Sequence, residues 1–370
     1  MNQSENKKTV VVGMSGGVDS SVAAWLLLQQ GYDVIGVTMQ IWQDEEEEVQ
    51  EENGGCCGLS AVEDARRVAH QLGIPYYVMN FKREFKRHVM DYFVEEYLKG
   101  RTPNPCIACN RYVKWESLLT RSMAIGADYI ATGHYAQVER LPNGRYGLRK
   151  SATDAKDQTY ALYNLTQEQL ARTLMPVGEY TKDEIRRMAR ELGLNVAHKA
   201  DSQEICFIPD HDYARFIENQ MASENQSSRL PGPGNFVDLQ GNIIGQHEGI
   251  THYTIGQRRG LRLPMGERAF VVEIRPETNE VVIGKGEDVF TDHLMCDKLN
   301  WIAIEGLGNE SMMVTAKIRY GHKGAPCQIC QIGEDLVACR FLEPVRAVTP
   351  GQAVVFYDGD YVIGGGTILK

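Results

Sequence analysis

Near the start of the chain, a run of β-branched residues breaks into a turn of glycine and serine. Residues 9–12 read Thr-Val-Val-Val, and they are followed by Gly13, Met14, Ser15, Gly16, Gly17, Val18, Asp19 and Ser20. The first run favours a buried strand. The serines and the acid favour the start of a helix, which we expect over 20–30 before Gly31. A strand, a tight turn and a helix in this order are typical of a parallel α/β sheet.

This turn has the composition of a phosphate site. Adjacent glycines allow positive φ angles and a close approach of the backbone to a ligand. Successive N–H groups in such a turn, with the positive end of the following helix, bind anions. The hydroxyls of Ser15, Ser20 and Ser21 offer further donors. A Walker A loop would need a lysine beside its serine or threonine, whereas the charged residue here is Asp19, which could hold Mg²⁺.

Strand and helix patterns alternate over the first 135 residues. We expect strands at 9–14, 32–40, 76–81 and 127–132, and helices at 20–30, 60–72, 84–98 and 111–124. This alternation predicts a parallel sheet whose ligand lies beyond the carboxyl ends of the strands. Gly13, Met39 and Gly133 fall at those ends. Further helices are expected at 167–174 and 182–192, the second with a capping box of Thr181 and Glu184.

The second half of the chain has a different pattern of apolar and polar residues. Residues 223–234 form a polar connector with proline and glycine, and short alternating runs follow from Arg268 onward. Several short strands at close spacing predict a small β-barrel. We therefore expect an α/β parallel-sheet domain over 1–210, a small central domain over 211–275 and a C-terminal β-barrel over 276–370.

Composition narrows the class of protein. The formal net charge is −10, much of it from seven acids and no base within 44–52, a block that we expect to be a solvated loop. Residues 1–8 are polar, and no apolar run approaches the roughly 20 residues of a membrane helix. A cytoplasmic protein without membrane contact is expected. Local basic clusters leave RNA binding open: Lys82, Arg83, Lys86 and Arg87; Arg111 and Lys114; Arg186, Arg187 and Arg190; Arg258, Arg259 and Arg262.

Nine cysteines in that compartment point to chemistry or metal binding more than to structural disulfides. Cys106 and Cys109 form a C-x-x-C pair just before a predicted helix, whose N-terminus would lower the pKa of Cys109. Cys206 is distant in sequence. By itself the pair is compatible with a redox, a zinc-binding or an inert role. Cys327, Cys330 and Cys339 are expected to be small core residues, and Cys56 and Cys57 loop thiols.

Several separated motifs occur here in one order. They are Ser15–Ser20, Asn104-Pro105, Cys109-Asn110, Thr132–Tyr135, Lys156-Asp157-Gln158, Asp201-Ser202 with Ile205-Cys206-Phe207, and Thr254–Arg258. In this set the chain resembles the bacterial tRNA-specific 2-thiouridylases, members of the PP-loop ATP pyrophosphatase superfamily. The resemblance extends over nearly the whole chain. It implies that the first domain is a PP-loop (adenine nucleotide α-hydrolase-like) domain.

The resemblance also implies a reaction. ATP with Mg²⁺ would adenylate O2 of the wobble uridine in a tRNA anticodon, and a cysteine persulfide would then supply sulfur. Cys109 would be the nucleophile and Cys206 the persulfide carrier, ending as a disulfide, with a cysteine desulfurase or a sulfur-relay protein as donor. The residues implied for ATP are 13–20, Met39 and Gly133. Those implied for tRNA are Asn104, Pro105, Cys106, His134, Lys156, Asp157, Gln158, Arg319, Tyr320 and Gln352.

The resemblance departs at Cys106, where the common family pattern has an aspartate. Cys106, Cys109 and Cys206 could instead hold a [4Fe–4S] cluster with one open iron. Apart from that alternative no metal site is expected, since His70, His88, His198 and His211 show no ligand spacing. Other readings are an amidating or ligating PP-loop enzyme and a non-catalytic RNA- or zinc-binding protein. Pyrophosphate release in the presence of tRNA separates the enzyme from the binding protein.

Overall fold

The computed structural model describes residues 7–41, 59–199, 205–263 and 268–369. The acidic block 44–52, Cys56, Cys57 and the motif residues 201–204 lie outside these ranges. The chain divides into two compact units. The first comprises Met1–Val89, Cys106–Pro209 and Asp360–Val362, and the second comprises Met90–Pro105, Asp210–Gly359 and Ile363–Lys370. Among the described helices, none has the length and apolar character needed to cross a bilayer.

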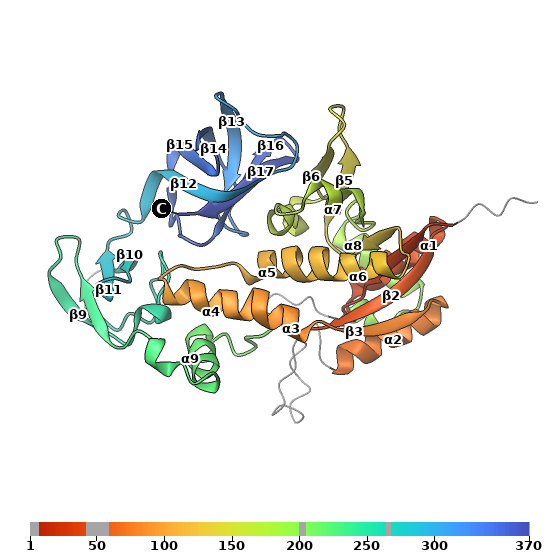
Figure 1. Ribbon diagram of the computed structural model, residues 1–370, viewed down its shortest axis with the longest axis horizontal. Coiled ribbons are helices and arrows are strands. Elements are labelled where there is room, and N and C mark those ends of the chain that lie inside the picture. Colours follow the sequence, from red (N-terminus) through yellow and green to blue (C-terminus); the bar gives the residue numbers. More distant parts are fainter. Residues whose placement is uncertain (1–6, 42–58, 200–204, 264–267, 370) are drawn as a thin grey trace, which may run out of the picture. The chain divides into compact units, whose positions relative to one another are not determined.

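A parallel sheet forms the centre of the first unit, as the sequence predicts (Figure 1). Its strand order is β3-β2-β1-β4-β7. The bounds are β1 (Thr9–Gly13), β2 (Asp33–Gln40), β3 (Tyr76–Asn80), β4 (Tyr129–Ala131) and β7 (Thr173–Leu174). Neighbouring strands pair in parallel throughout. The valines of β1 are fully buried because helices cover both faces of the strand.

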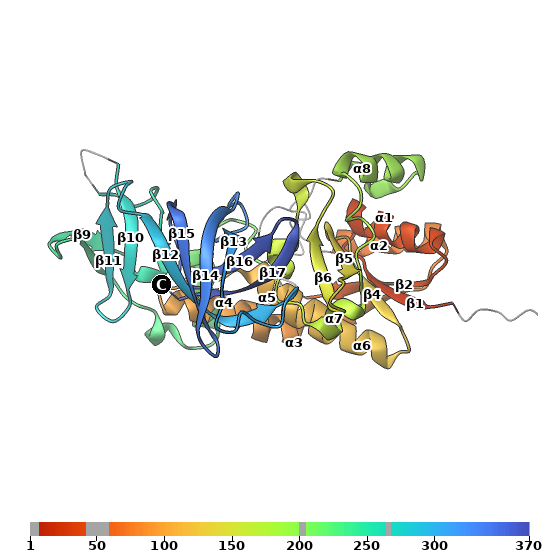
Figure 2. The same cartoon turned by 90° about the horizontal axis from the view of Figure 1, so that it is seen from above.

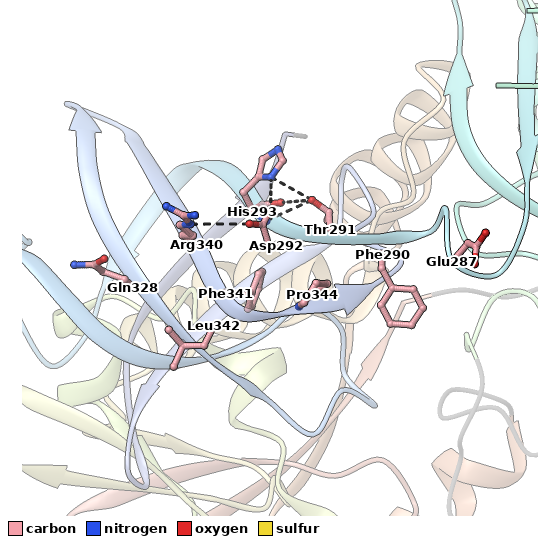
Figure 3. A pocket seen from close by; sticks show the side chains of 10 residues that line it. All are labelled: Glu287, Phe290, Thr291, Asp292, His293, Gln328, Arg340, Phe341, Leu342 and Pro344. Carbon is pink, nitrogen blue, oxygen red and sulfur yellow. Dashed lines mark hydrogen bonds and ion pairs between the residues drawn. The ribbon is translucent and has the colours of Figure 1, made fainter. Parts of the chain in front are cut away.

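Helices lie on both sides of this sheet. Figure 2 shows α1 (Val18–Gln29) and α8 (Lys182–Glu191) on one side of the strands and α6 (Leu119–Ala124) on the other. The α1 helix packs against α8 and against α2 (Leu59–Leu72). The shared core includes Val10, Val22, Ala65 and Ile185.

Two helices begin earlier than the sequence predicts. One runs through α3 (Lys82–Phe85), η1 (Lys86–Met90) and α4 (Asp91–Leu98), and the other through α5 (Pro105–Ala108), η2 (Cys109–Leu118) and α6. The turns of η1 and η2 are of the wider π type. The second helix begins at Pro105 because proline suits the first helical position, where no N–H is needed. The expectation of a helix start after Cys109 is therefore wrong.

Local patterns were less reliable around residue 170. The segment expected to be one helix over 167–174 splits into α7 (Gln167–Ala171) and the short parallel strand β7. A hairpin of β5 (Ala136–Arg140) and β6 (Tyr146–Lys150) was not predicted. The capping box at the start of α8 is confirmed, since the Glu184 N–H donates to Thr181 Oγ1 and the Thr181 N–H donates to the Glu184 carboxylate. Short 3₁₀ turns complete the unit: η3 (Asp154–Lys156), η4 (Thr159–Leu162) and η5 (Asn195–His198).

The second unit contains a small sheet of order β10-β11-β8-β9 and the helix α9 (Tyr213–Ser223). The strands are β8 (Gly234–Val237), β9 (Ile243–His247), β10 (Phe270–Arg275) and β11 (Glu280–Gly284), with 3₁₀ turns η6 (Ser227–Arg229) and η7 (Ile250–His252). Phe236, Val271 and Val281 form its core. The domain boundary expected between residues 275 and 276 lies in the turn that joins β10 to β11.

The predicted C-terminal β-barrel is confirmed. Its strands are β12 (Phe290–Trp301), β13 (Ser311–Lys317), β14 (Ala325–Gly333), β15 (Leu336–Arg346), β16 (Ala353–Asp358) and β17 (Tyr361–Ile368). They follow the order β12-β15-β14-β13-β16-β17, and β12 also pairs with β17, which closes the barrel. Cys327 and Cys339 are buried, as expected of core residues, whereas Cys330 is half-buried.

Candidate functional site

The turn between β1 and α1 can only be built with glycine at one position. Gly16 has φ +67°, and a Cβ there would lie 2.3 Å from the carbonyl oxygen of Ala61. Gly17 is the N-cap of α1 and brings no side chain to its first turn. The N–H groups at the start of α1 therefore remain for an anion, as the sequence suggests.

Two of the three loop hydroxyls shape the turn itself. Ser20 Oγ accepts from the Ser15 N–H at 3.2 Å, and the Ser21 hydroxyl donates to the carbonyl of Gly17 at 2.8 Å. Ser20 and Ser21 are buried, whereas Ser15 is exposed. Ser15 is thus the loop serine best placed to meet a ligand, and the expected ligand-facing hydroxyls of the other two are turned inward.

Residues from three neighbouring strands gather around this turn. β1 ends at Gly13, Met39 lies at the carboxyl end of β2, and Gly133 follows β4. A Cβ on Gly133 would lie 2.6 Å from the Ser20 nitrogen, so this glycine lets the chain pass directly over the start of α1. The Thr38 hydroxyl donates to the Met14 carbonyl at 2.7 Å and holds the turn against β2. Met14 and Val18 are themselves buried.

Asp19 in the first turn of α1 has two partners from distant parts of the chain. Both of its carboxylate oxygens lie 2.8 Å from Lys182 Nζ. The Tyr135 hydroxyl donates to Asp19 Oδ1 at 2.7 Å. Sequence reasoning identified Asp19 but missed both partners. One local signal was present, because Lys182 is the first residue of α8, where the helix dipole disfavours a positive charge.

The cysteine pair lies on the first turns of the helix that begins at Pro105. Cys106 is exposed and Cys109 is half-buried. Since Cys109 starts the η2 segment, it is inside the helix and not at its N-terminus, so the dipole argument for its acidity does not apply. Turns of the π type inside α-helices occur frequently at functional sites.

A chain of hydrogen bonds begins at the residue after Cys109. Asn110 is buried, and its amide donates to the carbonyl of Ala161 at 2.9 Å. Lys114 Nζ donates to Asn110 Oδ1 at 2.8 Å and lies 3.4 Å from His134 Nε2. His134 Nδ1 lies 2.7 Å from the Thr132 hydroxyl. This series of hydrogen bonds connects the cysteine helix to the loop after β4.

The protonation state of His134 follows from these partners. Burial lowers the pKa of His134 well below its usual range, and the Lys114 ammonium lowers it further. The ring is therefore neutral at pH 7. Because a lysine ammonium can only donate, Nε2 is the acceptor and Nδ1 carries the proton that is donated to Thr132.

The segment carrying Cys206 is anchored beside the cysteine helix. Cys206 is half-buried, and the next residue, Phe207, packs edge-on against Phe85 with ring centroids 5.6 Å apart. Phe85 belongs to α3, which packs against η2, the segment that Cys109 begins. Both cysteine segments are thus tied to α3.

The three cysteines do not form a metal site. In the parts of the chain that the structure describes, which include Cys106, Cys109 and Cys206, no three His, Cys, Asp or Glu side chains are arranged to hold a metal ion. The residues as placed therefore do not fit the iron–sulfur alternative.

Of the residues that the resemblance implies for tRNA, some are turned inward. Asp157 is buried, and its carboxylate accepts from the Thr159 hydroxyl at 2.7 Å. Gln158 Oε1 accepts from the Tyr135 N–H at 2.8 Å. Gln158 thus supports the loop that follows β4, whereas Asp157 holds Ser151 and Thr159 on either side of its own turn. Their neighbour Lys156 is half-buried.

The remaining residues of that set lie in the second unit. Arg319 donates to the carbonyl of Arg346 at 2.9 Å, and Tyr320 is 49% exposed. Gln352 donates to the carbonyls of Thr102 at 3.0 Å and Pro103 at 3.4 Å. Asn104 and Pro105 directly follow Thr102 and Pro103. Gln352 is therefore hydrogen-bonded to the segment that leads into the cysteine helix.

Comparisons with known proteins cover both units. Residues 8–210 match a family described as tRNA methyl transferase HUP domain, 225–285 match a tRNA methyl transferase PRC-barrel domain, and 291–368 match an aminomethyltransferase beta-barrel domain. A protein of Lachnoclostridium phytofermentans is 68% identical over 98% of this chain and 100% of its own length. Similar proteins of Clostridium perfringens (58%, covering 98% of each chain) and Clostridioides difficile (55%, covering 99% of each) bear the same name, tRNA-specific 2-thiouridylase MnmA.

Proposed function

This chain belongs to the family of tRNA-specific 2-thiouridylases, and from that premise we propose that it replaces O2 of the wobble uridine in tRNA anticodons with sulfur, at the expense of ATP. The observation that carries the proposal is the 68% identity to a relative over 98% of this chain and 100% of that relative. The reaction takes place in the cytoplasm, on tRNA as the macromolecular substrate.

Activation of the uridine falls to the loop of residues 13–20. Its N–H groups and the start of α1 receive the phosphates of ATP, with Met39 and Gly133 at the neighbouring strand ends. Uridine O2 attacks the α-phosphorus, pyrophosphate leaves, and the base carries an AMP leaving group. Mg²⁺ is commonly held by one carboxylate and phosphate oxygens, which suits Asp19, and when bound it neutralises charge on the departing pyrophosphate.

Sulfur transfer falls to the two cysteines beside α3. In this scheme Cys206 carries a persulfide received from a cysteine desulfurase or a sulfur-relay protein. The Cys109 thiolate attacks Sγ of Cys206 and releases hydrosulfide, which adds to C2 of the activated base and expels AMP. A Cys109–Cys206 disulfide remains, and a cellular thiol must supply two electrons before the next cycle. The shared anchoring of both cysteine segments on α3 supports this pairing.

Recognition of the RNA is assigned to residues of both units. Asn104, Pro105 and Cys106 meet the target base, which must leave the anticodon stack to react. Lys156, Arg319 and the exposed ring of Tyr320 are suited to phosphates and stacking. His134 orients the cysteine helix through Lys114, and Asp157 and Gln158 position the backbone near them in the first unit. Gln352 positions the backbone at Thr102, in the stretch that leads to Asn104.

The test uses purified protein, ATP with Mg²⁺, a tRNA transcript and a persulfide donor, with pyrophosphate and 2-thiouridine measured separately. Cys109→Ser and Cys206→Ser should each abolish thiolation while pyrophosphate release continues. Cys330→Ser, a half-buried barrel cysteine, is the matched control and should leave both readings unchanged. Sulfur incorporation by either active-site variant would refute the relay. Absence of tRNA-dependent pyrophosphate release from the wild type would refute the proposed function.

A further inference from the structure

The loop of residues 13–20 has no lysine of its own, yet a lysine reaches it from another helix. Lys182 Nζ lies 2.8 Å from both carboxylate oxygens of Asp19, which is in the first turn of α1. Its side chain is only 10% exposed. A positive charge is thus held at the end of α1 where the loop would receive phosphates.

The position of this charge is costly for the helix that supplies it. Lys182 is the first residue of α8, where the dipole disfavours a cation, and burial of an ammonium carries a desolvation penalty. Its partner Asp19 does not depend on it for position, because the Tyr135 hydroxyl also holds Oδ1 at 2.7 Å. The lysine therefore adds charge to the loop more than it adds structure.

From this geometry we propose that Lys182 is the phosphate-binding lysine of the site. In the nucleotide-free protein Asp19 neutralises the ammonium. When ATP binds, Nζ turns from Asp19 to the oxygens of the β- and γ-phosphates, and Asp19 becomes available to Mg²⁺. Lysine binds phosphate as a compact point charge, which suits a group that exchanges one anion for another. The inference rests on the proposed function, since it assumes that the loop binds ATP.

The test compares two nucleotides that differ only in the phosphates the lysine would touch. Equilibrium binding of ATP and of AMP is measured without tRNA, so that no turnover occurs. In Lys182→Met, ATP affinity should fall by roughly tenfold to a hundredfold, the range for a lost hydrogen bond to a charged group. AMP affinity should stay within about twofold of wild type, because AMP lacks the β- and γ-phosphates. Lys182→Arg should recover part of the loss.

Two further variants make the result specific. Arg187→Met removes an exposed cation from the same helix and should leave both affinities unchanged. Asp19→Asn releases Lys182 from its partner, so ATP binding without Mg²⁺ should be equal to or tighter than in wild type. Circular dichroism and thermal unfolding establish that each variant is folded.

An equal loss of ATP and AMP affinity in Lys182→Met, or an unchanged ATP affinity, would overturn the proposal and leave the pair as a structural link between α1 and α8. Failure of the proposed function looks different. In that case Lys182→Met would still weaken the binding of ATP and not of AMP, but the wild-type protein would not thiolate tRNA.

Discussion

The Gln352 side chain of the barrel donates a hydrogen bond to the Thr102 carbonyl at 3.0 Å, across 250 residues of sequence. The Thr102 N–H in turn donates to the carbonyl of Pro350 at 2.8 Å. The turn before β16 is thus hydrogen-bonded to the stretch of chain that ends at Asn104 and Pro105. These contacts couple the barrel to residues proposed to meet the target base.

Replacement of Gln352 by leucine should remove the hydrogen bond from its side chain to Thr102. We expect a loss of about 1 kcal/mol in unfolding free energy, the usual net value of a hydrogen bond. Thiolation should slow while ATP affinity stays unchanged, because the stretch leads to Cys106 and not to the nucleotide loop. Thermal unfolding, nucleotide binding and single-turnover thiolation measure the three quantities. Gln328→Leu, which removes an exposed hydrogen bond to Ser311 on the same barrel, is the control. Equal thiolation rates in Gln352→Leu and Gln328→Leu would contradict the coupling between the barrel and the residues proposed to meet the base.

Substitution of Gly133 by alanine should damage the nucleotide loop. The added Cβ would lie 2.6 Å from the Ser20 nitrogen and 2.7 Å from the Asp19 carbonyl carbon, both backbone atoms. The start of α1 must then shift, at a cost of about 1–3 kcal/mol in stability, and ATP affinity should fall. Isothermal titration with ATP checks the result. Gly232→Ala meets no atom within 4 Å and should bind ATP normally. Normal ATP binding by Gly133→Ala would mean that the loop adapts.

Removal of the Asn110 side chain should destabilise the cysteine helix. Asn110→Ala removes the Asn110 donor from the Ala161 carbonyl and one of the two side-chain acceptors described for Lys114, at a cost of about 1–3 kcal/mol. The helix register at Cys109 should also become less defined, so thiolation should fall. Urea unfolding and activity assays test both effects. Asn195→Ala, which breaks an exposed bond to Asp64, is the matched control and should change little. An Asn110 variant as stable as that control would show that the chain of hydrogen bonds contributes nothing.

The stability of the protein should decrease on mild acidification. Burial lowers the pKa of His247, and the charge of nearby His252 lowers it further. The unfolded chain therefore takes up a proton at this position at a higher pH, about 6.5, than the folded protein does at His247. Between that pH and the lowered pKa of the folded protein, each such group removes up to about 1.4 kcal/mol of stability per pH unit.

Urea unfolding at pH 8.0 and at pH 5.5 measures this dependence. His247→Phe, which keeps an aromatic ring against Phe236 and Tyr253, should reduce the difference between the two pH values. It should not abolish it, because burial also lowers the pKa of His134 and His322. A pH dependence unchanged in His247→Phe would mean that this ring does not contribute.

Local signals predicted the parts of the fold whose causes are local. The turn at Gly16 and Gly17, the strand before it and the capping box of Thr181 and Glu184 all depend on neighbours within a few residues, and all are present as predicted. The segment at 173–174 had helical context but became a strand. Thr173 is held there by the Trp115 indole, which donates to its hydroxyl at 2.7 Å across 58 residues. A contact between residues so far apart cannot be predicted from a short window of sequence.

The same division applies to the candidate site. The residue types and their order were sufficient to identify the family to which the chain belongs. They also predict an anion-binding loop and a reactive cysteine pair. Only the folded chain brings Lys182 to Asp19, turns Asp157 inward and attaches Gln352 to Thr102. The physical reason is range: glycine conformations, helix caps and strand propensity act between near neighbours in sequence. Ion pairs and side-chain hydrogen bonds act between groups that only the packing of distant elements brings within reach.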